Sequence, residues 1–381
     1  MLLLYSGHPK TNPRRYWEFL IVAAVDGMST DPEIQVPSDV LLELGMRALA
    51  LVGVTDPDAR VTMDILLTAD LRGVPTHGVQ RLLTYVPRLR SGLINPRPKI
   101  NVESPAPALK IIDGDNGLGP VVATKGMAEA ITLARSSGIG FVGCRKSNHF
   151  GDCAPYVLMA CRERMIGFAG ANSPPTMAPW GGLTKLIGNN PLAIGVPCDE
   201  DTPFVIDIAM SNSSRARIFN MAAKKEKIPG DWALDSAGKP TTDASEAIKG
   251  FVLPMGRHKG YGLAVAIDIL CGIVTGGAFS QGVKSLAESW DDPQSIGHFF
   301  ITIDATRFMP WEVFSERMKD LFGGLRGSRQ IDPEISIFVP GERGAQTERD
   351  RQRNGIPIVP RLLETLKGLA EGNYDYDIPK F

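Results

Sequence analysis

Hydrophobic residues recur every three or four positions along the first patterned part of the chain, which predicts amphipathic helices. The first helix is expected over residues 38–52. The second is expected over residues 55–72, because Thr55 is a good capping residue. A third is expected from Pro75, since proline suits the first helical turn, and Pro87 should kink or end it.

Apolar positions in the middle of the chain gather in short runs separated by proline, glycine and small polar residues. The runs predict strands at residues 109–113, 139–144, 166–171, 186–197, 204–209 and 298–304. Longer amphipathic stretches predict helices at residues 119–135, 155–164, 211–225, 263–274, 314–321 and 361–369. Residues 348–353 are expected to be a charged surface stretch. Short strands joined by turns favour a mixed, largely antiparallel sheet flanked by helices, an α/β (α+β) fold that is not Rossmann.

One glycine pattern resembles a dinucleotide-binding fingerprint, but its context argues against that interpretation. Residues 138–143 match GxGxxG. The fingerprint requires a strand before the glycines and a helix after them. Here a predicted helix comes first and a predicted strand follows, so we interpret Gly138 as the residue that ends the helix.

Composition narrows the class of protein without identifying it. The 381 residues fit two domains, or one domain with a large subdomain. A net charge of −1 gives the whole molecule no attraction to nucleic acid or to an anionic membrane, so neither is expected as a partner. The apolar run at residues 19–25 is too short to span a bilayer. We expect residues 1–27 to be a leader outside the core, with Met28 as the natural start.

The five cysteines are odd in number and form no CxxC pair. This usage favours reduced thiols, and we therefore expect a cytoplasmic protein without a cysteine-based zinc site. No HxH or HExxH spacing occurs either. A metal-dependent hydrolase or lyase is therefore disfavoured, and no metal site is predicted.

A histidine just after a predicted strand is the first candidate for chemistry. His149 stands in residues 145–152, beside Arg145 and Lys146. A histidine that titrates near neutrality suits the transfer of protons.

Three polar side chains are spaced to share one face of the predicted third helix. His77, Arg81 and Tyr85 follow each other at intervals of four residues. An imidazole, a guanidinium and a phenol on one face are unusual for packing, although a solvated helix face is also compatible with the spacing.

A basic, glycine-rich turn at residues 254–262 leads into a predicted helix and contains Arg257, His258 and Lys259. A helix N-terminus with nearby cations is typical of a phosphate site, and a solvated basic loop is the alternative.

Six short motifs occur in order along the chain. They are Thr76-His77-Gly78-(x2)-Arg81, Lys146-Ser147-Asn148-His149-Phe150-Gly151, Asn172-Ser173-Pro174-Pro175, Gly188-Asn189-Asn190-Pro191, Asp207-Ile208-Ala209 and His258-Lys259-Gly260-Tyr261-Gly262. Together they resemble the malate/L-lactate dehydrogenase family, which has the non-Rossmann fold of L-sulfolactate dehydrogenase. The resemblance extends over residues 32–370.

The resemblance implies a homodimeric NAD(P)-dependent oxidoreductase that transfers a hydride between nicotinamide and a 2-oxo acid or 2-hydroxy acid. It leaves the choice between NAD and NADP open. It also implies a leader at residues 1–31, a helical substrate and dimer domain from residues 32–105 with 305–381, and an NAD(P)-binding domain at residues 106–304. Alternatives are a reductase of a cyclic imine or a diketo sugar acid, and a catalytically silent nucleotide-binding homologue.

The matching motif positions carry the family's site residues. The catalytic positions fall on His149, His77 and Thr76, with His149 favoured as the proton donor. The substrate positions fall on Arg81, Tyr85 and Asn189, with Arg81 as the clamp for a carboxylate. The cofactor positions fall on Ser173, Asp207, Ile208, Ala209, Arg257 and His258.

Two motifs and one further position depart from the family pattern. Thr76 stands where serine is usual and keeps the hydroxyl, whereas Asn189 replaces a threonine hydroxyl with a carboxamide. The second change is expected to shift substrate choice. Ala216 stands where the family usually has glycine, and residues 277–297 contain no motif that we align with the family.

Overall fold

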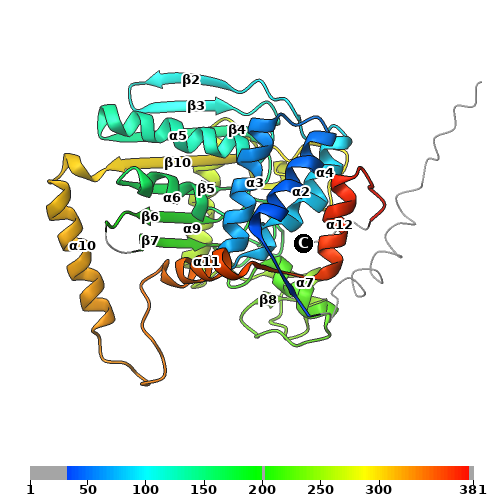
Figure 1. Ribbon diagram of the computed structural model, residues 1–381. Coiled ribbons are helices and arrows are strands. Elements are labelled where there is room, and N and C mark those ends of the chain that lie inside the picture. Colours follow the sequence, from blue (N-terminus) through cyan, green and yellow to red (C-terminus); the bar gives the residue numbers. More distant parts are fainter. Residues whose placement is uncertain (1–31, 200–201, 377–381) are drawn as a thin grey trace, which may run out of the picture.

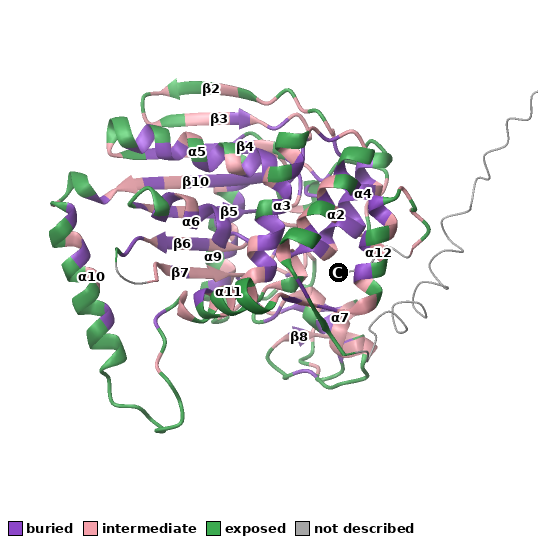
Figure 2. Ribbon diagram, in the orientation of Figure 1, coloured by how far each residue is buried: buried purple, intermediate pink, exposed green. Residues whose placement is uncertain are grey.

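The computed structural model describes residues 32–199 and 202–376 (Figure 1). The predicted leader at residues 1–31 lies outside the described residues. Within the described ranges, no helix has both the length and the apolar character needed to cross a bilayer. Buried residues concentrate in the central strands and on the inner sides of the helices around them (Figure 2).

Helices from early and late parts of the chain pack into one hydrophobic cluster. They are α2 (Ser38–Leu51), α3 (Asp56–Leu71), α4 (Leu82–Arg90) and α12 (Pro360–Ala370), grouped at the right of Figure 1. Two short antiparallel strands, β1 (Ile34–Val36) and β11 (Ile356–Ile358), tie the two parts together. Leu41, Leu66 and Leu366 are almost fully buried in this cluster. The first two predicted helices are confirmed.

The predicted third helix is wrong at its start. Two 3-10 turns, η1 (Pro75–His77) and η2 (Val79–Arg81), replace its first turns, and α4 begins only at Leu82. Gly78 separates the two turns with an extended backbone, at φ −86° and ψ −155°. The residues at 77, 81 and 85 therefore do not project from one continuous helix. α4 also continues past Pro87, to Arg90.

Seven strands form the main sheet, in the order β2-β3-β4-β10-β5-β6-β7. They are β2 (Asn101–Ala106), β3 (Leu109–Asp113), β4 (Ile139–Ser147), β5 (Met165–Ala171), β6 (Leu192–Val196), β7 (Phe204–Ile208) and β10 (Ile296–Asp304). β3 and β4 pair in parallel, and the other neighbouring pairs of this sheet are antiparallel. This confirms the predicted mixed, largely antiparallel sheet and the absence of a Rossmann arrangement in the described chain.

Helices cover both faces of the sheet. α5 (Gly119–Ser137) and α6 (Ala154–Arg162) pack on one face over Val142 and Phe300. α9 (His258–Asp268) packs on the other face against Phe299, because neighbouring residues of a strand point to opposite faces.

The glycines at residues 138–143 take the structure expected of a helix end followed by a strand. Gly138 adopts a left-handed conformation with φ 79° directly after α5, and β4 begins at the next residue. Only glycine enters this region without strain, which explains the residue. The interpretation that these glycines are not a dinucleotide fingerprint is confirmed.

Several boundaries differ from the prediction. β6 begins at 192 rather than 186, and α9 begins at 258 rather than 263 before a π-helical turn, η3 (Ile269–Ile273). Small elements fill the region after β7: α7 (Arg215–Ala223), β8 (Ala233–Leu234), α8 (Ala244–Lys249) and β9 (Phe251–Val252). The stretch expected at 348–353 to be charged surface lies in a helix, α11 (Glu342–Asn354). Ala345 is its one buried residue, so the helix carries no apolar stripe that would reveal it.

The helix that follows β10 lies away from the helical cluster. This helix, α10 (Trp311–Arg326), forms an arm at the left of Figure 1. Its Phe322 is buried against Cys198 and Val339.

Candidate active site

His77 and His149 lie side by side in the structure although they belong to separate segments of the chain. His77 ends η1, and His149 lies two residues beyond the last residue of β4. Their rings stack with centroids 5.5 Å apart and an angle of 20° between the ring planes. The pairing of these two side chains in one site is therefore a property of the folded chain.

Tyr85 holds His149 at two atoms. Its hydroxyl lies 2.7 Å from His149 Nδ1 and 3.1 Å from the His149 main-chain oxygen. The hydroxyl donates its own proton to that oxygen, which leaves a lone pair facing Nδ1. The competing Gly151 N–H is farther from Nδ1, at 3.4 Å. We therefore assign the ring proton to Nδ1, so that Nε2 is the nitrogen that exchanges protons.

His77 is oriented in a similar way. Thr76 Oγ1 lies 3.1 Å from His77 Nδ1. A threonine thus supplies the hydroxyl that the family usually takes from serine. In both histidines a hydroxyl group lies within hydrogen-bond distance of Nδ1, which fixes the plane of each ring.

Arg81 gives the site its charge. Its side chain is buried, with 6% of the residue exposed. Burial lowers the pKa of Arg81 to about 10, so the guanidinium stays charged at neutral pH. Burial, and then the charge of Arg81, lower the pKa of His77 to about 3 and hold the pKa of His149 well below its usual range. Both shifts favour the neutral imidazole.

Asp70 shapes the turn that carries His77 and Arg81. Its Oδ2 accepts the Val79 N–H at 2.7 Å, and a Cβ added to Gly78 would lie 1.9 Å from its Oδ1. Burial raises the pKa of Asp70 to about 7, although the Val79 N–H and Arg351 lower it. Glycine is therefore required at residue 78, because the buried Asp70 carboxyl occupies the space that a Cβ would need. Nothing in the sequence around Asp70 indicated this role.

Gly78→Ala should lower the free energy of unfolding by about 3 kcal/mol, the upper range for overpacking a filled site. Urea unfolding followed by circular dichroism measures it. Gly323→Ala is the matched control, since a Cβ there meets nothing within 4 Å inside α10 and should be neutral or stabilising. Equal stability of Gly78→Ala and the wild type would contradict the packing argument.

Ser173 and Asn189 belong to one locked turn. Ser173 Oγ donates to Asn189 Oδ1 at 2.7 Å, and the Ser173 N–H donates to Asn190 Oδ1 at 2.9 Å. A Cβ on Gly188 would lie 2.2 Å from the Ser173 main-chain oxygen. The carboxamide that departs from the family pattern is thus used inside the turn.

Asp207 has a structural partner in the helix that follows His149. Its Oδ2 accepts the N–H groups of Cys153 and Ala154, at 2.8 and 2.7 Å, at the start of α6. Ile208 pairs with Leu192 at the end of β7, beside the partly buried Ala209. The carboxylate therefore fixes the far end of the His149 turn.

Arg257 and His258 lie at the exposed start of α9. The backbone of Arg257 is in an unusual conformation with φ 61°, and the His258 ring meets the edge of Trp180 at 6.2 Å. The structure keeps this basic turn solvent-facing.

Sequence reasoning missed three residues around His149. Gln294 Oε1 accepts the His149 N–H at 3.0 Å. The His298 ring stacks on Phe150 with centroids 4.5 Å apart. Arg88, fully buried on α4, holds the loop that carries Gln294. His298 was assigned only to a strand, and neither of the other two belongs to a recognised motif.

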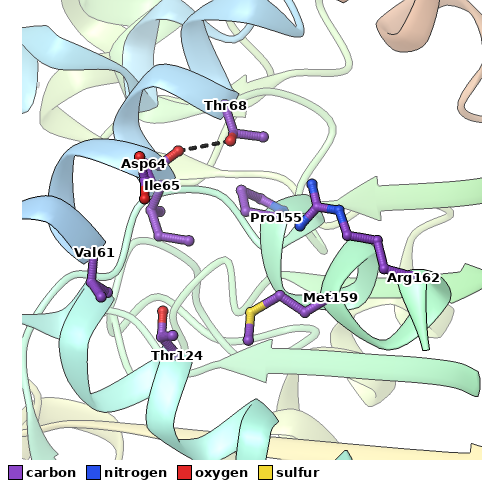
Figure 3. Close-up of a pocket in the computed structure, with 8 residues that line it drawn as sticks. All are labelled: Val61, Asp64, Ile65, Thr68, Thr124, Pro155, Met159 and Arg162. Atoms are coloured by element: carbon purple, nitrogen blue, oxygen red, sulfur yellow. Dashed lines mark hydrogen bonds between the residues drawn. The ribbon is translucent and has the colours of Figure 1, made fainter. Parts of the chain in front are cut away.

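A cavity of about 180 Å³ lies elsewhere, between α3, α5 and α6. Figure 3 shows Ile65, Thr124, Met159 and Arg162 among its lining residues. It contains none of the predicted site residues. Among the described residues no group of three or more His, Cys, Asp or Glu side chains could hold a metal ion, and all five cysteines are free and buried.

Comparison with known proteins places this chain in a family. The family model for malate/L-lactate dehydrogenase matches residues 36–367. Malate dehydrogenase of Pyrococcus horikoshii is 40% identical over 346 residues, covering 89% of this chain and 95% of that protein. The solved sulfolactate dehydrogenase of Methanocaldococcus jannaschii superposes with a TM-score of 0.84 at 36% identity, covering 89% and 97% of the two chains.

A solved delta1-piperideine-2-carboxylate reductase from Pseudomonas syringae is also similar, with a TM-score of 0.80 at 27% identity over 88% of this chain and 99% of that one. The matches extend over nearly the whole described chain. The chain therefore belongs to the malate/L-lactate dehydrogenase family.

Proposed function

We propose that the protein reduces a 2-oxo acid, and oxidises the matching 2-hydroxy acid, as a malate- or lactate-type dehydrogenase. Membership of the family makes it an NAD(P)-dependent oxidoreductase. The observation that carries the proposal is the stack of His77 on His149 beside the buried guanidinium of Arg81. This arrangement supplies a proton-transfer group and a carboxylate clamp in one water-poor site.

In the proposed mechanism Arg81 binds the substrate carboxylate through its fork of N–H donors. His149 gives a proton from Nε2 to the carbonyl oxygen during reduction, and takes it back during oxidation. The Tyr85 hydroxyl accepts a hydrogen bond from His149 Nδ1–H throughout the reaction, so the ring keeps its orientation. When bound, the nicotinamide cofactor supplies or accepts the hydride.

Substrate binding should also prepare His149 for its role. Burial, and then the charge of Arg81, lower the pKa of His77 and His149. A bound carboxylate offsets the charge of Arg81, so the pKa of both histidines rises when substrate binds. This shift favours the imidazolium that reduction needs.

The start of α9 fits the phosphates of a nicotinamide cofactor. No side chain caps this helix, and Arg257, His258 and Lys259 are exposed around its first turn. Cations beside the positive end of a helix dipole favour anions. Ser173 and the end of β7 at Asp207, Ile208 and Ala209 are proposed as the other wall of the cofactor site. The choice between NAD and NADP depends on whether the cations meet a 2′-phosphate.

We also propose the domain division, dimer and location expected from the sequence. Residues 32–105 with 305–381 would form the substrate and dimer domain, and residues 106–304 the NAD(P)-binding domain. The supporting observation is that the helical cluster and the main sheet have separate hydrophobic cores. The homodimer and the cytoplasmic location follow from the family resemblance and the five free thiols.

A substrate panel tests the proposal. Purified protein should oxidise NADH or NADPH with malate-type and lactate-type 2-oxo acids, followed by the cofactor absorbance. Cyclic imines and diketo sugar acids complete the panel, because the piperideine-carboxylate reductase shares the fold. A thermal-shift screen with each cofactor runs in parallel. If only imines or sugar acids were reduced, they would replace 2-oxo acids as the proposed substrate class. If the protein neither reduced a substrate nor bound a cofactor, it would be a catalytically silent homologue.

A further inference from the structure

Residues 283–294, here called the Gln294 loop, join the turn η4 (Ser280–Gly282) to β10. Both ends of the loop are buried, at Val283 and Gln294. The loop lies within residues 277–297, where the sequence carries no recognised motif. It nevertheless contacts His149, so its role must be derived from its contacts.

Gln294 reaches His149 just beyond the end of the β10–β4 ladder. Ile296 pairs with Ser147 there, next to a register shift between Ile296 and His298. Ser295, with φ 54°, turns the chain out of the ladder before Gln294. The Gln294 side chain makes the contact instead: Oε1 accepts the His149 N–H at 3.0 Å. At the other end of the carboxamide, Nε2 donates to the Lys284 oxygen at 3.3 Å.

A buried cation holds the loop in place. The Arg88 guanidinium donates to the main-chain oxygens of Leu286, Ser289 and Asp292, at 3.2, 2.6 and 3.3 Å. It also lies 5.3 Å from the centre of the Trp290 ring. Burial lowers the pKa of Arg88 to about 10, so the group stays charged at neutral pH. One planar cation thus bonds to three points of a loop that has no regular structure of its own.

The same helix therefore reaches His149 by two routes. Tyr85 and Arg88 are one turn apart on α4. Tyr85 contacts the imidazole Nδ1 and the main-chain oxygen directly, and Arg88 acts through the loop on the main-chain N–H. Together these contacts fix the backbone and the ring of His149 at three atoms.

We propose that Gln294 and Arg88 are positioning residues for His149, and that the Gln294 loop sets the place of His149 Nε2. The inference rests on the proposed function, since it assumes that Nε2 exchanges the proton. A misplacement of about 1 Å can cost about 100-fold in rate. Arg81, the proposed carboxylate clamp, belongs to η2 and not to the loop. Loss of the loop contact is therefore expected to reduce kcat rather than raise KM.

The test compares Gln294→Leu, Gln294→Glu and Arg88→Lys with the wild type. Gln294→Leu removes the acceptor and should lower kcat by about 10- to 100-fold, with KM changed less than about threefold. Gln294→Glu keeps an acceptor and should restore most of kcat. Its added negative charge near His149 should move the ionisation seen in kcat to higher pH. Arg88→Lys keeps the charge but bonds fewer carbonyls, and should resemble Gln294→Leu.

Gln281→Leu is the matched control, because it makes the same substitution at an exposed position before the loop. A readout independent of turnover is the ¹⁵N spectrum of histidine-labelled protein, which has only five histidines. Gln294→Leu should speed exchange of the His149 amide proton and change its ring signals. If the wild type reduces no substrate, the proposed function is wrong. The spectrum still shows whether Gln294 positions His149, because it does not depend on turnover. Wild-type kcat together with unchanged His149 exchange in Gln294→Leu would overturn the inference.

Discussion

His149→Asn should lower kcat for reduction of a 2-oxo acid by about 10²- to 10⁴-fold, the usual contribution of a positioned acid–base group. Asparagine has a similar size and keeps polar atoms near Tyr85, but it cannot carry the proton. The loss should appear in kcat and kcat/KM together, because the missing interaction belongs to the transition state. Stopped-flow measurement of cofactor absorbance separates the chemical step from product release.

The pH dependence distinguishes His149 from His77. Burial, and then the charge of Arg81, lower the pKa of both rings, which favours their neutral forms. Reduction needs the protonated ring, so its rate should fall as pH rises through the pKa of the substrate complex. Oxidation needs the neutral ring, so its rate should rise over the same interval. The ionisation seen in kcat should lie at higher pH than that seen in kcat/KM, because bound carboxylate offsets Arg81.

His77→Asn is the companion variant for this experiment. It should weaken turnover while keeping the ionisation of the wild-type profile, whereas His149→Asn should lose that ionisation. The Thr76 hydroxyl beside His77 Nδ1 supports an orienting role for this ring in the stack. If His77→Asn lost the ionisation and His149→Asn kept it, the two roles would be exchanged.

Arg81→Lys should lower kcat/KM for a 2-oxo acid by about 100-fold, or roughly 2.7 kcal/mol, within the range for a disrupted buried charge contact. Lysine keeps a charge but offers a single point where the guanidinium offers a planar fork. Its ammonium is also more strongly hydrated and loses more when it is buried as deeply as Arg81. Steady-state kinetics over the substrate panel measure the change.

Two controls isolate the carboxylate contact. Arg90→Lys makes the same substitution at the exposed end of α4, where Arg90 lies 3.7 Å above the Tyr374 ring, and should leave kcat/KM nearly unchanged. A substrate amide lacks the carboxylate, so wild type and Arg81→Lys should reduce it about equally poorly. A full 100-fold difference with the amide would assign Arg81 to another role than the clamp.

The pattern of the sequence was most informative where structure depends on neighbours in the chain. The stripe over residues 38–52 and the capping threonine at 55 predicted α2 and α3 because helices bury every third or fourth residue. Gly138 was correctly interpreted because a left-handed residue after a helix is a local requirement. The same logic failed for α11, whose sequence carries almost no buried residue.

Local reasoning also failed at residues 75–81, and the cause lies outside that segment. Helical spacing predicted one face for His77, Arg81 and Tyr85. The buried Asp70 instead takes the Val79 N–H and the space beside Gly78, which breaks the helix into two turns. His77 and Tyr85 still contact His149, and the charge of Arg81 still acts on it, but these side chains come from the two turns and α4 rather than from one helix face.

The sequence by itself determined which side chains are available for chemistry, the family, and a mixed sheet that is not Rossmann. The tertiary structure alone decided that the two histidine rings stack, that Tyr85 holds His149 Nδ1, and that Gln294 accepts the His149 N–H. It also decided that burial lowers the pKa of both histidines. The physical reason is that stacking, register and desolvation depend on distances between residues far apart in the chain, which periodicity and motif order do not contain.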